Sequence, residues 1–252
     1  MDKCFENFVG VIDSGVGGLT ILKQLQCDFP TSNFVYIADG AYCPYGTKQP
    51  HEILFRAEQL IHYLQQCGVQ AVVIACNTAS VYADTLRQKF DLPIYDVITT
   101  TCKRVEDLSK NKRVALLATN ATVASKIYQQ ELESKGITVI AFACSEFVTF
   151  VEADKIETYD CSVAVEKALC NLPKCNVDSV ILGCTHFPLL RKKIAPYANG
   201  AKIVECCTNF QPPKCFSGNG IGKTVFLTTG VKKNANRAAK WFGNVNFSHI
   251  DI

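Results

Sequence analysis

The chain has 252 residues, of which 48% are hydrophobic and 19% are charged, and its formal net charge is +3. This length and composition predict a globular protein of one large or two small domains and exclude a disordered chain. The small charge surplus argues against nucleic acid as a partner. The longest apolar runs are of strand length, too short to span a membrane.

Strand-like and helix-like segments alternate along the first hundred residues. In chain order the expected elements are a strand at 8–12, a helix from about residue 18, a strand at 33–38, a helix at about 51–66, a strand at 71–75, a helix to about residue 90 and a strand at 93–98. These strands are apolar along their whole length, which is typical of parallel sheets covered by helices on both faces.

The pattern then starts again. Expected strands at 113–119 and 179–185 repeat the character of the first and third strands, and Cys184 follows Cys76 by 108 residues. A last strand at 224–228 and a helix around residues 237–241 remain. We therefore expect an α/β protein with two similar, pseudo-symmetric parallel-sheet domains, flanking helices, and an active site in the cleft between them.

Polar side chains follow the predicted strands, where ligands bind in open parallel sheets. They are Asp13, Ser14, Asp39, Cys76, Asn77, Thr78, Thr119, Thr122, Cys184, Thr185 and His186. If two duplicated units face each other, each brings one cysteine to a shared cleft.

Two thiols on opposite faces of one carbon atom suit stereochemical inversion, because a proton can leave on one side and return on the other. Such a reaction is a racemisation or epimerisation. The base must be a thiolate, so its neighbours must lower a pKa that is ordinarily about 8.5. We expect helix N-termini directly after Cys76 and Cys184 to contribute, together with His186 and Asp13.

The cysteine content is high, at 14 residues, and no C-x-x-C motif is present. The N-terminus lacks the pattern of a signal peptide, so we interpret most cysteines as reduced thiols that pack as small apolar residues. A non-catalytic metal or redox protein is an alternative, although the cysteine spacing forms no ligand cluster. The glycine-rich stretch 13–18 is a weak nucleotide motif and a better turn for aiming Asp13 and Ser14 into a cleft.

Four segments resemble the glutamate racemases of the cofactor-independent aspartate/glutamate racemase superfamily. They are GVIDSGVGGL at 10–19, PYGTK at 44–48, ACNTAS at 75–80 and LGCTHFPLL at 182–190. The resemblance implies interconversion of L- and D-glutamate by two-base proton transfer at Cα, without a cofactor or a metal, to supply D-glutamate for peptidoglycan synthesis.

The resemblance also implies roles for individual residues. Cys76 and Cys184 would be the acid/base thiols, Asp13 and His186 their activating partners, and Glu152 a supporting catalytic acid. The implied substrate-binding residues are Asp13, Ser14, Pro44, Tyr45, Gly46, Asn77, Thr78, Thr119, Thr122 and Thr185. The expected partners are glutamate and a second copy of the chain, in a cytoplasmic homodimer that binds neither membrane nor nucleic acid.

The same resemblance implies that the C-terminal segment completes the first domain. We expect residues 1–96 plus 209–252 to form the first α/β domain and residues 97–208 the second. A racemase for aspartate or another acidic amino acid is the nearest alternative function.

Overall fold

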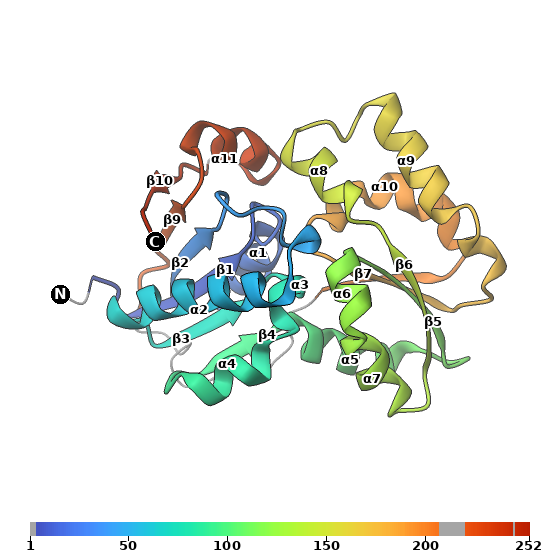
Figure 1. The fold of residues 1–252 in the computed structure, drawn as a ribbon, viewed down its shortest axis with the longest axis horizontal. Coiled ribbons are helices and arrows are strands. Elements are labelled where there is room, and N and C mark those ends of the chain that lie inside the picture. Colours follow the sequence, from blue (N-terminus) through green and yellow to red (C-terminus); the bar gives the residue numbers. More distant parts are fainter. Residues whose placement is uncertain (1–3, 207–219, 244) are drawn as a thin grey trace.

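The structure is a computed structural model that describes residues 4–206, 220–243 and 245–252. Within these residues the strands form two sheets, one of six strands and one of four, and helices flank both (Figure 1). Every neighbouring pair of strands is parallel. The expected α/β class with two parallel-sheet units is confirmed.

The first sheet has the strand order β10-β9-β2-β1-β3-β4. Its strands are β1 (Phe8–Asp13), β2 (Asn33–Ala38), β3 (Ala71–Ile74), β4 (Ile94–Asp96), β9 (Thr224–Thr228) and β10 (Ser248–His249). The connecting helices are α1 (Leu19–Asp28), α2 (Pro50–Gln66), α3 (Asn77–Ser80) and α4 (Ala83–Lys89).

The second sheet has the order β6-β5-β7-β8. Its strands are β5 (Arg113–Ala118), β6 (Thr138–Ala143), β7 (Ser179–Gly183) and β8 (Lys202–Glu205). Its helices are α5 (Val97–Leu108), α6 (Asn120–Ser125), α7 (Ile127–Glu133), α8 (Glu146–Glu152), α9 (Tyr159–Leu169) and α10 (Arg191–Ile194). The order 6-5-7-8 repeats the order 2-1-3-4 of the first sheet, so the internal duplication predicted from the sequence is present in the topology.

The C-terminal segment returns to the first sheet. Strand β9 pairs with β2, with Phe226 opposite Tyr36, and is followed by α11 (Lys232–Ala238) and the short 3₁₀ helix η6 (Ala239–Phe242). The domain limits expected from the sequence stay predictions. The limit at 208/209 and most of the proline-rich stretch at 211–220 lie outside the described residues.

Helices cover both faces of the first sheet, which explains why its strands are apolar throughout. Leu22 and Leu25 of α1 pack with Val11 of β1 on one face, and Leu60 and Leu64 of α2 pack on the other. Each such fully buried side chain stabilises the fold by roughly 1.5–3 kcal/mol. Both faces of the sheet are therefore core, and the polar residues gather at the strand ends.

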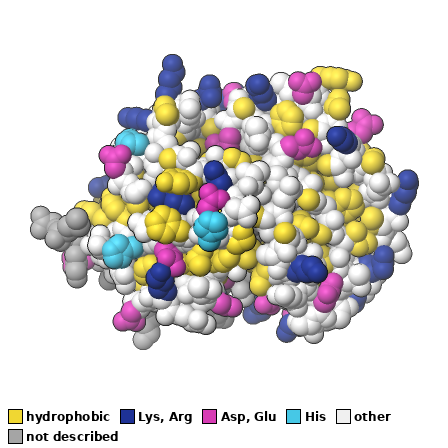
Figure 2. Space-filling model, in the orientation of Figure 1, with side chains coloured by type: hydrophobic (Ala, Val, Ile, Leu, Met, Phe, Trp, Pro, Cys, Tyr) yellow, Lys and Arg dark blue, Asp and Glu magenta, His cyan; other side chains and the backbone are white. Residues whose placement is uncertain are grey.

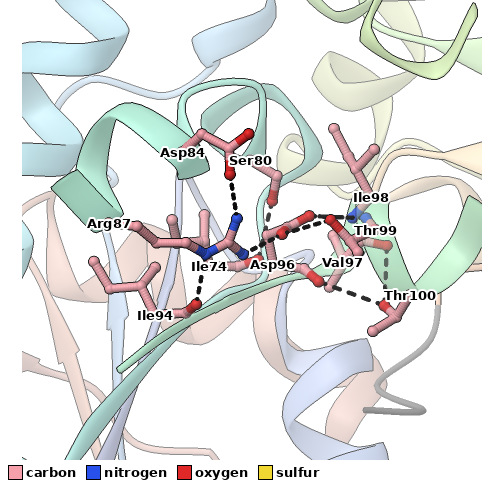
Figure 3. A network of polar contacts seen from close by, with 10 residues as sticks. All are labelled: Ile74, Ser80, Asp84, Arg87, Ile94, Asp96, Val97, Ile98, Thr99 and Thr100. Carbon is pink, nitrogen blue, oxygen red and sulfur yellow. Dashed lines mark hydrogen bonds and ion pairs between the residues drawn. The ribbon is translucent and has the colours of Figure 1, made fainter. Parts of the chain in front are cut away.

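The junction between the two units differs from the sequence-based prediction. Strand β4 ends at Asp96 rather than at Ile98, because the Asp96 side chain caps α5 by accepting hydrogen bonds from the backbone N–H groups of Ile98 and Thr99, both at 2.9 Å (Figure 3). The other Asp96 carboxylate oxygen binds Arg87 of α4 at 2.5 Å. The predicted single helix after residue 76 is also wrong, since it is divided into α3 and α4.

The surface carries charges of both signs. Figure 2 shows Lys, Arg, Asp and Glu side chains interspersed over one face of the molecule. Among the described helices, none is both long and apolar enough to cross a bilayer.

Candidate active site

The predicted site residues lie at the carboxyl ends of strands in both sheets. Asp13 ends β1 and Cys76 follows β3, while Thr119 follows β5 and Cys184 follows β7. Glu152 is the last residue of α8. Hydrogen bonds join side chains of the two units, so the strand ends of the first sheet face those of the second.

Asp13 connects the two units through its carboxylate. Its Oδ2 accepts a hydrogen bond from the Thr185 hydroxyl at 3.0 Å, and its Oδ1 accepts one from the backbone N–H of Gly15 at 2.9 Å. Burial raises the pKa of Asp13 to about 6, although the nearby charge of His186 and these two hydrogen bonds act in the opposite direction. Asp13 is thus a buried carboxyl that can hold or release a proton near neutral pH.

His186 lies between Glu152 and Cys184. Its Nε2 is 2.7 Å from Glu152 Oε1, and its Nδ1 is 3.7 Å from Cys184 Sγ. Glu152 Oε1 also accepts a hydrogen bond from the Val16 backbone N–H at 2.9 Å. A glycine is required at position 17, because a Cβ there would overlap the His186 ring. The imidazole is therefore held on both ring nitrogens beside one thiol.

The protonation of His186 and Glu152 follows from this contact. Burial alone would lower the pKa of His186, but the hydrogen bonds and charges of Cys184 and Glu152 outweigh burial and raise it well above its ordinary value. Burial would raise the pKa of Glu152, but the hydrogen bond and charge of His186 lower it. We conclude that the pair is an imidazolium and a carboxylate at neutral pH.

Cys76 lies directly before α3, and its Sγ is 3.8 Å from the Ser14 hydroxyl. Burial, followed by the charge of Asp13, raises the pKa of the Cys76 thiol to about 12. The charge of Cys184 adds to this increase. The backbone N–H of Ala79 in α3 and the Ser14 hydroxyl lower the pKa of Cys76, as expected of its neighbours, but burial and Asp13 raise it more. The expected net decrease is therefore wrong for Cys76.

One further expectation needs correction. No helix starts directly after Cys184, since Thr185 and His186 form a turn before the 3₁₀ helix η3 (Phe187–Leu190). The hydrogen bonds of Asp13 go to Gly15 and Thr185, whereas its charge acts on Cys76, with which it lines one small space. Asp13 therefore lies between the two cysteines, and its role as the partner of Cys76 stays a prediction.

Three threonine hydroxyls form a buried cluster between the units. Thr78 Oγ1 is 2.9 Å from Thr119 Oγ1 and 3.3 Å from Thr122 Oγ1, and the latter two are 2.9 Å apart. Gly46 packs against Thr119 so closely that a Cβ at residue 46 would overlap it. These four predicted binding residues therefore meet at one place, with hydroxyl donors suited to a carboxylate.

Asn77 and Tyr45 use their polar atoms on protein partners. Asn77 accepts a hydrogen bond from the Tyr128 hydroxyl at 2.7 Å, and its amide donates to Cys206 Sγ at 3.0 Å. The Tyr45 hydroxyl donates to Asp39 at 2.5 Å. The Tyr45 hydroxyl is thus held by Asp39, while the residue lines a small space together with Asp13 and Cys76. This anchor positions the Pro44–Gly46 segment.

A cavity of about 670 Å³ lies beside this site. Its lining includes Gly15, Cys43, Pro44 and Glu152 together with residues of α8, β9 and α11, but neither Cys76 nor Cys184. Both cysteines are buried, with Cys76 5% and Cys184 6% exposed. The two cysteines therefore lie deeper than the cavity, in a closed arrangement.

Comparison with known proteins identifies the family. Residues 20–208 match the family described as Asp/Glu/Hydantoin racemase. The chain belongs to this racemase family. A glutamate racemase of Persephonella marina is 36% identical over 226 residues, which are 87% of each chain.

Solved structures of racemases share the whole fold. The glutamate racemase isoform RacE1 of Bacillus anthracis matches with a TM-score of 0.86 at 27% identity, over 97% of each chain. The glutamate racemase of Francisella tularensis, solved in complex with D-glutamate, matches with a TM-score of 0.82 at 27% identity, over 99% of this chain and 97% of that one. The racemase fold thus extends beyond the residues matched by the family comparison.

Several residues around the site were not predicted as members of it. Asp39 was noted only as a polar strand end, yet it accepts hydrogen bonds from Tyr45, Arg56 and Thr229. Tyr36 lies inside an apolar strand, and its hydroxyl donates to the Gly15 carbonyl at 2.7 Å. A tyrosine in the middle of a buried strand was the available signal, because a buried hydroxyl needs a partner. The sequence of α2 contains no comparable signal that would identify Arg56 as a residue near the site.

Proposed function

We propose that this chain interconverts L- and D-glutamate and uses Cys76 and Cys184 as the two acid/base groups. The observation that carries the proposal is the placement of two buried thiols at equivalent strand ends of two similar units. The family match and the relative solved with D-glutamate support the substrate. The product D-glutamate would supply peptidoglycan synthesis.

The reaction moves one proton at Cα. One cysteine, as thiolate, takes the Cα proton, and the opposite thiol gives its own proton to the other face of the carbanion. The two sulfur atoms thereby exchange protonation states, and the reverse reaction uses them in the opposite order. Each thiol therefore has to serve as an acid in one direction and as a base in the other.

The two thiols differ in how they obtain a thiolate. Cys184 has the His186 imidazolium at 3.7 Å, and Glu152 holds that ring in place. Cys76, with its pKa raised to about 12, remains a thiol until a positive charge comes close. The ammonium group of a bound amino acid supplies such a charge, so we infer that glutamate itself activates Cys76.

The remaining predicted residues would bind the substrate. Hydrogen-bonding groups without a fixed positive charge are offered by the second N–H of the Asn77 amide, by the Pro44–Gly46 backbone, and by the hydroxyls of Ser14, Thr78, Thr119, Thr122 and Thr185. Such groups hold carboxylates without neutralising a thiolate. Binding requires the closed site to open, because Cys76 and Cys184 are both buried and neither lines the neighbouring cavity.

The proposal includes a homodimer in a reducing cytoplasm and catalysis without a cofactor. Both thiols have to stay unpaired, and neither Cys76 nor Cys184 forms a disulfide in the structure. Light scattering of the purified protein tests the dimer, and activity after gel filtration and chelator treatment tests cofactor independence.

Aspartate is the competing substrate, and it would bind in the same site with its side-chain carboxylate one carbon closer to Cα.

The decisive experiment is incubation of the protein with L-glutamate or D-glutamate in D₂O. We expect deuterium at Cα together with loss of optical rotation. The absence of both changes would refute the proposal.

C76A and C184A should each lose racemisation by several orders of magnitude. C102A is the matched control. Cys102 and Cys184 are both 6% exposed, but Cys102 lies in a different hydrophobic core cluster. Faster exchange with aspartate would assign the alternative substrate.

A further inference from the structure

A buried tyrosine of the first sheet reaches the acid/base group of the second unit through one peptide group. The Tyr36 hydroxyl donates to the Gly15 carbonyl oxygen at 2.7 Å. The N–H of the same peptide group, which belongs to Val16, donates to Glu152 Oε1 at 2.9 Å. The Gly15–Val16 peptide group is thus held at both ends, by β2 on one side and α8 on the other.

The same Glu152 oxygen continues the connection to the thiol. Glu152 Oε1 is 2.7 Å from His186 Nε2, and His186 Nδ1 is 3.7 Å from Cys184 Sγ. A Cβ on residue 15 would overlap this Glu152 oxygen, so glycine permits the close approach. The orientation of one peptide group therefore sets the position of the carboxylate that holds His186.

We propose that Tyr36 is a positioning residue, which fixes Glu152 and His186 beside Cys184 through the Gly15–Val16 peptide group. The inference rests on the proposed function for the role of Cys184. The Tyr36 side chain is fully buried, and its ring packs 6.1 Å from that of Phe247. Burial, followed by the charges of Asp13 and Glu152, raises the pKa of Tyr36 well above its ordinary value, so the hydroxyl remains a donor at every working pH.

Substitution of Tyr36 by phenylalanine removes the hydroxyl and keeps the ring packing. Without the hydroxyl the peptide group can turn away, and Glu152 loses the Val16 N–H and its fixed contact with His186. The pKa of Glu152 should then rise and that of His186 should fall, because the contact shifts them in the opposite directions. The pH range in which both groups are charged becomes narrower from both sides.

The test is histidine titration by NMR on the whole chain labelled with ¹⁵N-histidine. The chain has 4 histidines, and H186N assigns the relevant signal. For Y36F we expect a lower titration midpoint of His186, a narrower pH–kcat profile, and about a five-fold lower kcat with KM changed less than about two-fold. The NMR measurement needs no turnover, so it distinguishes a failure of this inference from a failure of the racemase proposal.

Y128F is the matched control. Tyr128 is equally buried, and its hydroxyl donates to Asn77 at 2.7 Å, on the Cys76 side. We expect Y128F to leave the His186 titration unchanged. If Y36F does not fold, G15A displaces Glu152 from the other side of the same peptide group and should lower the His186 midpoint. An unchanged His186 titration in the folded variant would overturn the inference, even if activity falls.

Discussion

Two buried aspartates at neighbouring strand ends have opposite environments. Asp13 ends β1 and accepts hydrogen bonds from an amide and a hydroxyl, and the charge of nearby His186 offsets only part of the effect of its burial, whereas Asp39 follows β2 and forms an ion pair with Arg56 at 2.8 Å. A buried carboxylate without a cation in direct contact destabilises the folded state, and a paired one does not. The same substitution at the two positions should therefore change stability in opposite directions.

We expect D13N to stabilise the protein at neutral pH while it reduces racemisation. The pKa of Asp13 is raised to about 6 in the folded protein, so the folded state binds the proton more tightly than the unfolded chain. This costs stability above about pH 6, and the cost disappears as the pH falls towards 4. Urea denaturation should show that D13N raises the free energy of unfolding by on the order of 2 kcal/mol at pH 8 and changes it little at pH 4.5.

D39N is the control for that prediction. It leaves the Arg56 guanidinium buried without its charge partner, which typically costs about 3–5 kcal/mol. It also weakens the anchor of Tyr45. A loss of stability at pH 8 in D13N, or a gain in D39N, would contradict this explanation of the two environments.

At the residue scale the sequence predicts which side chains meet better than it predicts their protonation. Strand ends and duplication place Asp13, Cys76, Cys184 and His186 together. The hydrogen-bond partner of the Asp13 carboxylate could not be predicted. Thr185 and Ser14 both lie near this carboxylate, and only the three-dimensional arrangement selects one of the two hydroxyls. The raised pKa of Cys76 depends on burial, which the sequence does not state.

Among the secondary-structure elements, α5 has the strongest local signal for its first residue, the N-cap Asp96. This side chain accepts two backbone hydrogen bonds at the helix start, and it also binds Arg87 and the Thr99 hydroxyl (Figure 3). The cap lies where the chain passes from the first sheet to the second. It therefore fixes the direction in which α5 leaves β4.

We expect D96A to lower the free energy of unfolding by about 2–3 kcal/mol, since it removes an N-cap and leaves Arg87 partly buried without this partner. D84A is the control, because Asp84 binds the same arginine but its side chain is 89% exposed. D84A should cost less than about 0.5 kcal/mol. Chemical denaturation of both variants measures the difference, and equal effects would contradict the role assigned to the cap.

Elements with strong apolar patterns were predicted from the sequence almost to the residue. Strands β2 and β9 have the expected limits, since each is a compact apolar run. Strands β6 and β8 were not predicted, because both are edge strands of the second sheet and are only partly buried. The pattern of burial on both faces, which reveals a central strand, is absent at an edge.

For the whole molecule, duplication sets the position of the site. Two sheets with the same strand order bring equivalent strand ends to face each other, and contacts between the units close the site around the thiols. A further contact between the units is the ion pair at 2.5 Å between Lys240 of η6 and Asp154, which follows α8. Because both cysteines are buried, we expect substrate to reach them only when the two units move apart.

This closure predicts an order of thiol reactivity. Cys27 and Cys170 are exposed, whereas Cys76 is buried and its pKa of about 12 leaves a very small thiolate fraction at pH 7.5. We expect iodoacetamide to alkylate the exposed thiols on the order of a thousand-fold faster than Cys76, so that activity survives their modification. Peptide mass spectrometry over time measures each rate, and labelling in urea gives the control in which the difference disappears. Alkylation of Cys76 at the rate of Cys27 in the folded protein would show that the site is open in solution.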